Sequence, residues 1–498
     1  MTTPPPYSSL LRAVTLGTAR RDPPAEVATW LASLDAVDPT ADDAERLLAA
    51  IAVGERLERL RPHRARPPSG PADVAPAETG SPPALRLARG LQLMLEGTYT
   101  ELLDEGIDLV LERKTYVPPP LLPALLQRAA ALMEEDFPRA RTYVRAGGRR
   151  ANWLAERNPD WAELATGFDY VRAWRATDQP SHRAKLLARW RFTAPDAARE
   201  ALAKGWSDQS PRNQEILLEG MAVGLSAADH SWLRESLSPK RKGVRRVLTA
   251  LLLRAGEPEA IADLGELARA IVSEGGDLRT TVVHAEHKEL LKKYGGLKAP
   301  QTLDQWLLEI MPPSSWDEWV KLKPPTWWLS LKPLQVRSVG RAVATFDNPG
   351  RKVEFLDFLL RESPPQFPAE LGVELVRQLP DAAFDRLYES LLTDQRDALR
   401  LRGLPRWLAL NRRSAWSERL TRAMVRRLLD DLENRQLDYA TQRDLALHWK
   451  LATPLLHPAV FSWLRQQLHS ATERYDAFGK LATTMLQTTA FRRELSRT

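Results

Sequence analysis

The sequence predicts an all-α protein, an α-solenoid of irregular helix pairs like those of HEAT and armadillo repeats. Leu, Ala, Arg and Glu dominate the chain, and apolar residues recur three and four positions apart, as in helices that bury one stripe. Proline, glycine and short polar clusters interrupt this pattern about every 12 to 20 residues, which is typical of short helices joined by tight corners. Strand signals are scarce, and the best candidate, residues 280–284, is too short to indicate a sheet.

Length and composition indicate about three domains or one elongated array rather than a single core. The chain has 498 residues, more than one compact domain usually contains, and 43% of them are hydrophobic, which is enough to bury a core. The net charge of +7 is mild for this length and is compatible with an acidic partner. The absence of cysteine excludes disulfides and thiolate chemistry and fits a reducing compartment.

The N-terminus does not resemble a signal peptide, because prolines stand where basic residues are needed and Arg12 interrupts the short apolar run. No stretch reaches the roughly 20 apolar residues that cross a bilayer. We therefore expect a cytoplasmic protein that does not bind a membrane.

The first two segments differ in composition. Residues 1–60 form a predicted N-terminal helical segment, in which Leu47, Leu48 and Ile51 fall near one helical face. Residues 61–84 lack apolar periodicity and are rich in Pro, Ala and Gly, so they cannot bury enough apolar surface to offset their ordering entropy. We predict a flexible linker at 61–84.

Two predicted helical repeat arrays follow, at residues 85–310 and 337–498. The octapeptide PDAAREAL at 195–202 returns in the second array as PDAAFDRL at 380–387. Each copy places proline in the first turn of a helix, where its missing N–H costs nothing, and Asp at the positive end of the helix dipole. Helix pairs that recur at roughly 30 to 45 residues are typical of solenoids, whose neighbours stack around a continuous core.

A Trp/Pro-rich junction, residues 311–336, separates the two arrays. It contains Trp316, Trp319, Trp327 and Trp328 among prolines and lysines. Tryptophans in such a broken stretch are most often packing anchors. The alternative is that their rings stack bases or bind a proline-rich peptide.

The first candidate binding site is a basic corner between two predicted helices, made of Lys240, Arg241, Lys242, Arg245 and Arg246. Cations at the start of a helix oppose its dipole, which suggests a site for a phosphate or an acidic surface. The structural alternative is a solvated corner, in which a basic residue ties neighbouring repeats together through an acidic partner.

Two further stretches are rich in arginine. Residues 137–150 carry Arg139, Arg141, Arg145, Arg149 and Arg150, of which Arg149 and Arg150 are candidate binding residues, and residues 396–427 carry ten arginines. If a solenoid aligned these patches on one face, they would form a positive groove for an acidic protein or for nucleic acid. No zinc-finger, RRM or KH pattern supports nucleic acid.

Catalytic signatures are missing from the sequence. It contains no GxGxxG, no P-loop and no GxSxG pattern. His284 and His287 fit one helical face and could bind zinc, but their spacing matches neither HExxH nor HxxEH. We expect no catalytic residues, no cofactor and no metal, and a metal-dependent enzyme at these histidines is the third alternative.

Residues 148–161, GRRANWLAERNPDW, resemble a motif of an uncharacterised bacterial family, a domain of unknown function. Its pattern is Gly-x-Arg-Gly-x-Trp-Leu-Ala followed by Asn-Pro-x-Trp, and Ala151 replaces the second glycine. The matching positions are Gly148, Arg150, Trp153, Leu154, Ala155, Asn158, Pro159 and Trp161. The likeness runs through most of the chain, and the motif looks structural.

Such families tend to be encoded beside MoxR-type AAA ATPases and von Willebrand factor A proteins. The resemblance therefore implies an accessory or scaffold role near such machinery. The expected function is a non-catalytic, protein-binding scaffold with an extended helical surface, and the alternative is nucleic-acid binding through the Arg-rich patches.

Overall fold

The structure is a computed structural model that separates into two units, residues 1–74 and residues 75–498, each of which we describe by itself. The residues it describes are 25–32, 42–60, 74–237, 241–272, 278, 287–297, 301–324, 326–346, 348–362, 364, 367–395, 397–433, 438–474 and 476–497.

The first unit contains two described helices, α2 (Ala25–Ala32) and α3 (Asp43–Leu60). Asp42 caps α3, since its carboxylate accepts hydrogen bonds from the backbone N–H groups of the next turn, at 2.8 Å from that of Glu45. A small core joins the helices and includes Trp30 and Leu47. Leu48 was expected near the same face as Leu47, but 60% of its surface is exposed, since successive residues stand about 100° apart around a helix.

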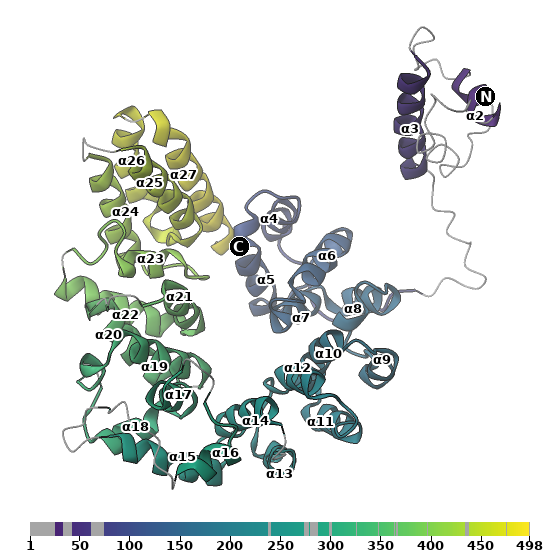
Figure 1. The fold of residues 1–498 in the computed structure, drawn as a ribbon. Helices are drawn as coiled ribbons and strands as arrows, with labels where there is room; N and C mark the ends of the chain where they lie inside the picture. The colour runs from purple at the N-terminus through teal and green to yellow at the C-terminus, as the bar shows by residue number, and fades with distance from the viewer. Residues whose placement is uncertain are drawn as a thin grey trace. The chain divides into compact units, whose positions relative to one another are not determined.

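The second unit, which we call the main unit, consists of helices joined by short corners (Figure 1). Its α-helices are α4 (Leu85–Leu95), α5 (Leu103–Glu112), α6 (Leu122–Leu132), α7 (Phe137–Ala146), α8 (Gly148–Arg157), α9 (Tyr170–Ala176), α10 (Pro180–Thr193), α11 (Pro195–Lys204), α12 (Pro211–Met221), α13 (His230–Glu235), α14 (Lys242–Arg254), α15 (Pro258–Ile271), α16 (His287–Lys293), α17 (Leu303–Ile310), α18 (Pro313–Val320), α19 (Pro333–Thr345), α20 (Pro349–Glu362), α21 (Ala369–Gln378), α22 (Asp381–Asp394), α23 (Leu404–Leu410), α24 (Glu418–Glu433), α25 (Tyr439–Ala452), α26 (Phe461–Arg474) and α27 (Asp476–Ser496).

The prediction of an all-α protein is confirmed. Within the described ranges, extended backbone pairs only at two isolated bridges, Ser81 with Thr115 and Val272 with Leu278. None of the described helices combines the length and the apolar character that spanning a bilayer requires.

Proline starts many of the helices, as expected for a residue that has no N–H to leave unsatisfied. In the first copy of the octapeptide, Pro195 is the first residue of α11 and Asp196 lies in the first turn. In the second copy, Pro380 is the N-cap of α22, so this helix begins at Asp381. The shared motif therefore starts a helix in both places.

Helices stack on the next helix but one. The contacts run from α10 to α12 to α14, and again from α17 through α19, α21, α23 and α25 to α27, while α20, α22 and α24 form a second row. Figure 1 shows these helices following one another along the main unit. One hydrophobic core runs from Tyr170 to Met485, because each pair buries its apolar stripe against its neighbours.

Arginine–carboxylate pairs link successive helix pairs. Three of them are Arg341 with Glu309, Arg351 with Asp317 and Arg361 with Asp394, whose partners stand 32, 34 and 33 residues apart. These separations fall within the helix-pair period that the sequence indicates. These three arginines therefore connect neighbouring helix pairs.

The Trp/Pro-rich junction, residues 311–336, lies inside this core. Trp316, Trp327 and Trp328 are each 1% exposed, and the indole N–H of Trp327 donates to Asp317 at 3.2 Å. These three rings are packing anchors and cannot stack bases without unfolding their surroundings. The core continues through the junction, and a boundary between two cores lies instead between Ala165 and Tyr170.

Candidate functional site

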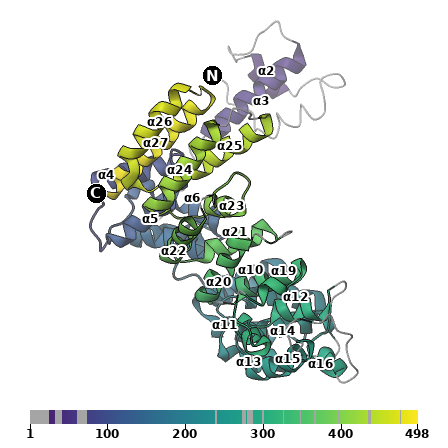
Figure 2. The ribbon, with the colours of Figure 1, turned by 90° about the vertical axis from the view of Figure 1, so that its left-hand side faces the viewer.

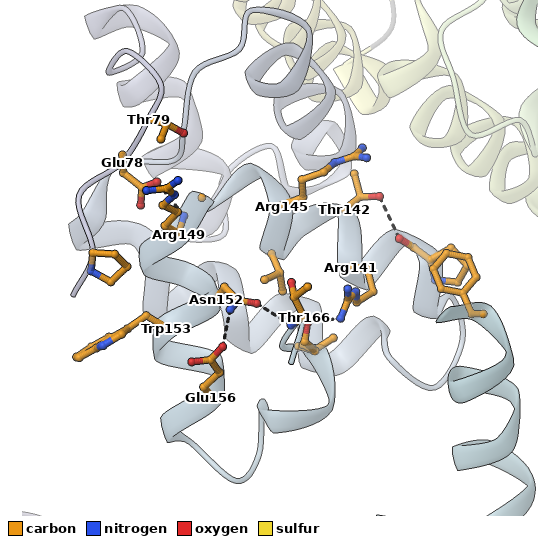
Figure 3. A pocket seen from close by; sticks show the side chains of 16 residues that line it. Glu78, Thr79, Arg141, Thr142, Arg145, Arg149, Asn152, Trp153, Glu156 and Thr166 are labelled. Atoms are coloured by element: carbon orange, nitrogen blue, oxygen red, sulfur yellow. Dashed lines mark hydrogen bonds between the residues drawn. The ribbon is translucent and has the colours of Figure 1, made fainter. Parts of the chain in front are cut away.

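The candidate functional site is an open pocket of about 780 Å³ between α7 and α8 of the main unit (Figure 3). Helix α7 provides Arg141 and Arg145, and α8 provides Arg149 and Trp153. The remaining walls come from residues 76–79, from the corner after α8, and from α10.

Arginines from the two helices line the pocket. Arg141 and Arg145 stand four residues apart on α7, so both side chains leave the same helical face. Arg141 is fixed there, because its guanidinium donates to the carbonyl oxygens of Leu164 at 3.0 Å and Ala165 at 2.8 Å. Arg145 and Arg149 are exposed, and among the described residues their guanidinium groups form no ion pair.

A carboxylate from outside the helices occupies the start of α8. Glu78 accepts hydrogen bonds from the backbone N–H groups of Arg149 and Arg150, each at 2.8 Å. These N–H groups have no partner within the helix, and a negative charge is favourable at that end of the dipole. Gly148 has a φ of 72°, and a Cβ atom there would lie 2.2 Å from a Glu78 oxygen. Contact with Glu78 therefore requires glycine at this motif position.

Glu78 belongs to the segment predicted as a flexible linker, residues 61–84. Residues 61–73 lie outside the described residues, so there the linker stays a prediction. From residue 74 onward the chain makes defined contacts, of which Glu78 at α8 is one and the bridge of Ser81 to Thr115 is another. Composition did not indicate these contacts, because one carboxylate and one bridge bury little apolar surface.

Gly148→Ala should destabilise the main unit by about 1–3 kcal/mol, the usual cost of a non-glycine residue held at positive φ with a displaced contact. Chemical denaturation followed by circular dichroism measures this loss. Gly205→Ala is the matched control, since Gly205 has open space around the added Cβ, and it should stay within about 0.5 kcal/mol of the wild type. Equal stability of the two variants would show that Glu78 and Gly148 do not constrain each other.

The α8 side of the pocket is held by hydrogen bonds. The Asn152 amide donates to Glu156 at 2.7 Å and accepts from the backbone N–H of Thr166 at 2.7 Å. The guanidinium of Arg157 covers the Trp153 ring at 4.1 Å. Both acidic residues of the lining, Glu78 and Glu156, therefore already accept hydrogen bonds. Three arginines, Arg141, Arg145 and Arg149, stand against these two carboxylates, so the formal charge of the lining is +1.

Arg139, the remaining arginine of the 137–150 stretch besides Arg150, binds within the protein. Burial disfavours its charge, but hydrogen bonds to Asp108 and Asp104 outweigh that effect and raise the pKa of Arg139. Its Nε lies 2.7 Å from Asp104. This arginine therefore joins α7 to α5 and has a structural role.

The basic corner does not gather its cations into one site. Lys240 lies outside the described residues, Arg245 is buried, and Arg241 donates to the side chain of Gln214 at 2.5 Å. Lys242 is exposed, whereas Arg246 is half-buried and its Cγ would contact a Cβ added at Gly295. Of the predicted binding residues, Arg149 lines the pocket and Arg150 lies beside it through its N–H on Glu78, whereas none of the corner's described residues contributes to the lining.

Most arginines of residues 396–427 have partners of their own. The pairs are Arg402 with Asp444, Arg406 with Asp431, Arg412 with Asp381, Arg413 with Asp136, Arg422 with Glu418 and Arg427 with Asp397. Arg396 lies outside the described residues. Few described arginines of this stretch are therefore left to form a groove of unpaired guanidinium groups.

The described residues provide no metal site for the alternative of a metal-dependent enzyme. His284 lies outside the described residues, and His287 is the first residue of α16. In the parts of the chain that the structure describes, no group of three or more potential ligand residues could hold a metal ion.

Sequence reasoning missed the roles of Glu78, Arg145 and Trp153. A signal for Arg145 was present, since Arg141, Arg145 and Arg149 follow one another at intervals of four. The family-like motif marked Trp153 as well, but its residues were interpreted as structural.

Comparison with known proteins gives a family and no nearer relative. A family model described as a family of unknown function, DUF5691, matches residues 9–498. Neither the curated proteins nor the solved structures contain a match to the chain.

Proposed function

The chain belongs to this family of unknown function, and we therefore propose a role from its own geometry: a non-catalytic scaffold that binds other proteins. In this proposal the main unit is an α-solenoid of the HEAT or armadillo kind. The stacking of helices on the next but one and the ion pairs at intervals of 32 to 34 residues support that assignment. Stacked pairs offer a long surface to a partner without requiring a reaction site.

The proposed binding site rests on one observation, the exposed arginines of the α7–α8 pocket. Guanidinium groups form strong paired hydrogen bonds with carboxylates, so Arg145 and Arg149 suit an acidic segment of a partner protein. Trp153 adds an aromatic wall that can pack against an apolar side chain of the same segment. The net charge of +7 favours encounter with such a partner.

The partner we propose is a MoxR-type AAA ATPase or a von Willebrand factor A protein in the cytoplasm. This part rests on the family resemblance of residues 148–161. The alternative, nucleic-acid binding through Arg-rich patches, is weakened because most arginines of residues 396–427 are paired with carboxylates.

Reversing two charges tests the site. The double variant Arg145→Glu, Arg149→Glu should bind a fluorescent octaglutamate peptide at least about tenfold more weakly than the wild type, equivalent to about 1.4 kcal/mol. The reason is that attraction at the pocket wall becomes repulsion. Fluorescence anisotropy at low ionic strength measures the change.

The matched control is Arg172→Glu, Arg175→Glu, which changes the net charge equally on the exposed surface of α9. It should keep nearly wild-type affinity. An equal loss of affinity in both double variants would show that the effect comes from net charge alone, and it would contradict the pocket as the binding site. Binding of duplex DNA that falls steeply with salt would instead favour the nucleic-acid alternative.

A further inference from the structure

The main unit contains two separate hydrophobic cores. The first is formed by α4 to α8 and the corner after α8, from Leu87 to Ala165, together with Leu495 of α27, and we call α4 to α8 the first body. The second lies within α9 to α27 and runs from Tyr170 to Met485, and these helices form the second body. Bodies with separate cores are joined only by the contacts at their junctions, which makes relative motion between them possible.

One junction is the chain connection at residues 165–170, together with contacts around α10. The buried guanidinium of Arg189 donates to Glu134 at 2.7 Å and also pairs with Glu163 of the first body. Beside it, the rings of Phe137 and Phe192 meet edge to face at 5.8 Å. These contacts lie next to the covalent connection, so they suit a hinge.

The other junction lies at the opposite end of the sequence, where α27 returns to α4 and α5 (Figures 1 and 2). Leu495 is buried in the core of the first body, although α27 as far as Met485 packs in the second. It lies over Gly90, where an added Cβ would come within 2.4 Å of its side chain. Glycine at position 90 thus makes room for the end of the chain.

An aromatic pair and an arginine complete this junction. The rings of Phe491 and Tyr99 are stacked with centroids 4.3 Å apart, and Tyr99 has a φ of 56°. That left-handed conformation is unfavourable for a tyrosine and persists only where neighbours enforce it. Arg492 is buried and donates to Glu105 at 2.5 Å and to the Leu456 carbonyl at 2.9 Å, so it ties both bodies together.

The α7–α8 pocket depends on both bodies. Arg141 and Arg145 line it from the first body, whereas Phe192 lines it from α10 of the second. A further link reaches α7 itself, because Arg413 pairs at 3.0 Å with Asp136, the N-cap residue of this helix. Movement of the second body would change the pocket wall and remove a cation from Asp136.

We propose that the contact of α27 with α4 and α5 is a latch, which opens about the 165–170 hinge and controls the affinity of the α7–α8 pocket for acidic segments. The part that concerns affinity rests on the proposed function. Opening leaves the carboxylate of Asp136, at the start of α7, without Arg413. The uncompensated negative charge weakens the binding of a negatively charged ligand.

The latch can be tested without any partner, because the chain has no cysteine and two introduced ones can carry spin labels at defined places. We choose Arg89→Cys on α4 and Gln466→Cys on α26, two exposed positions of the full chain. The labelled protein should give one narrow distance distribution by pulsed electron resonance. Adding Leu495→Asp should shift the distribution to longer distances, because a charge cannot stay in the first core.

Two further variants supply a second disruption of the latch and a control. Phe491→Ala removes the stacking partner of Tyr99 while leaving Leu495 apolar, and it should lengthen the same distance in part. Thr484→Ala is the control on α27, since its hydroxyl donates within its own helix to Lys480 at 2.9 Å, and it should change nothing. An unaltered distribution in both latch variants, with wild-type helix content, would overturn the latch.

Binding to octaglutamate then tests the control of the pocket. Leu495→Asp should weaken binding at least threefold relative to Thr484→Ala. A longer label distance with unchanged affinity would overturn the coupling between latch and pocket. If the wild type does not bind the peptide at all, the proposed function fails, whereas the distance measurement still decides the latch.

Discussion

Asp229→Ala should cost the main unit about 3–5 kcal/mol of folding free energy, the usual loss when a buried ion pair is left with one partner. Arg191, 1% exposed, donates to the two oxygens of Asp229 at 3.2 Å and 2.9 Å. Arg199 adds a third hydrogen bond at 3.1 Å, and the backbone N–H of Ser226 a fourth at 3.0 Å. Removing Asp229 therefore leaves a buried guanidinium without its counter-charge at the corner after α12.

Asp196→Ala is the matched control. Asp196 binds Arg199 at 2.8 Å, but 68% of its side chain is exposed, so its loss should cost less than about 1 kcal/mol. Urea denaturation followed by circular dichroism compares the two variants. Similar midpoints for both would show that the buried pair contributes no more than a surface one.

The pH dependence gives a second readout of the same variant. Burial would raise the pKa of Asp229, but hydrogen bonds from Arg191, Ser226 and Arg199 outweigh it, and the pKa is lowered. A lowered carboxylate pKa stabilises the folded state above its ordinary value of about 4, and this contribution is lost as pH falls through the folded pKa. The stability difference between wild type and Asp229→Ala should therefore shrink below about pH 4.

Helix content could be predicted from the sequence because it depends on local spacing. Pro195 and Asp196 start α11 as expected, since a missing N–H and a negative charge act within the same turn. The tryptophans of the junction were correctly interpreted as packing anchors, because burial in the core is favourable for large aromatic rings. Trp327 and Trp328 are both buried there.

The site could be predicted in part, because it depends on which helices meet. Arg149 and the corner's Arg245 are alike as sequence, yet Arg149 is exposed at the α7–α8 pocket and Arg245 is buried in α14. The contact between Glu105 and Arg492 joins residues 387 positions apart, and no periodicity carries information over that distance. The way the helices stack decides which distant helices meet, whereas the sequence pattern shows only which face of each helix is apolar.

Trp328→Ala should destabilise the main unit by about 3–5 kcal/mol, because it opens a large cavity where the predicted junction meets α20. The Trp328 ring contacts Phe355 at 5.1 Å and Phe358 at 5.6 Å, and Trp327 lies 5.8 Å away. Leu329→Ala is the control next in sequence, since 57% of Leu329 is exposed, and it should stay within about 0.5 kcal/mol of the wild type.

Differential scanning calorimetry distinguishes two consequences of this cavity. If the core from Tyr170 to Met485 folds as one body, Trp328→Ala lowers a single transition for all of it. The separate core from Leu87 to Ala165 should then melt closer to its wild-type temperature, because its helices do not contact Trp328. A variant that lowers every transition equally would contradict the division into two cores, and with it the physical basis of a hinge at 165–170.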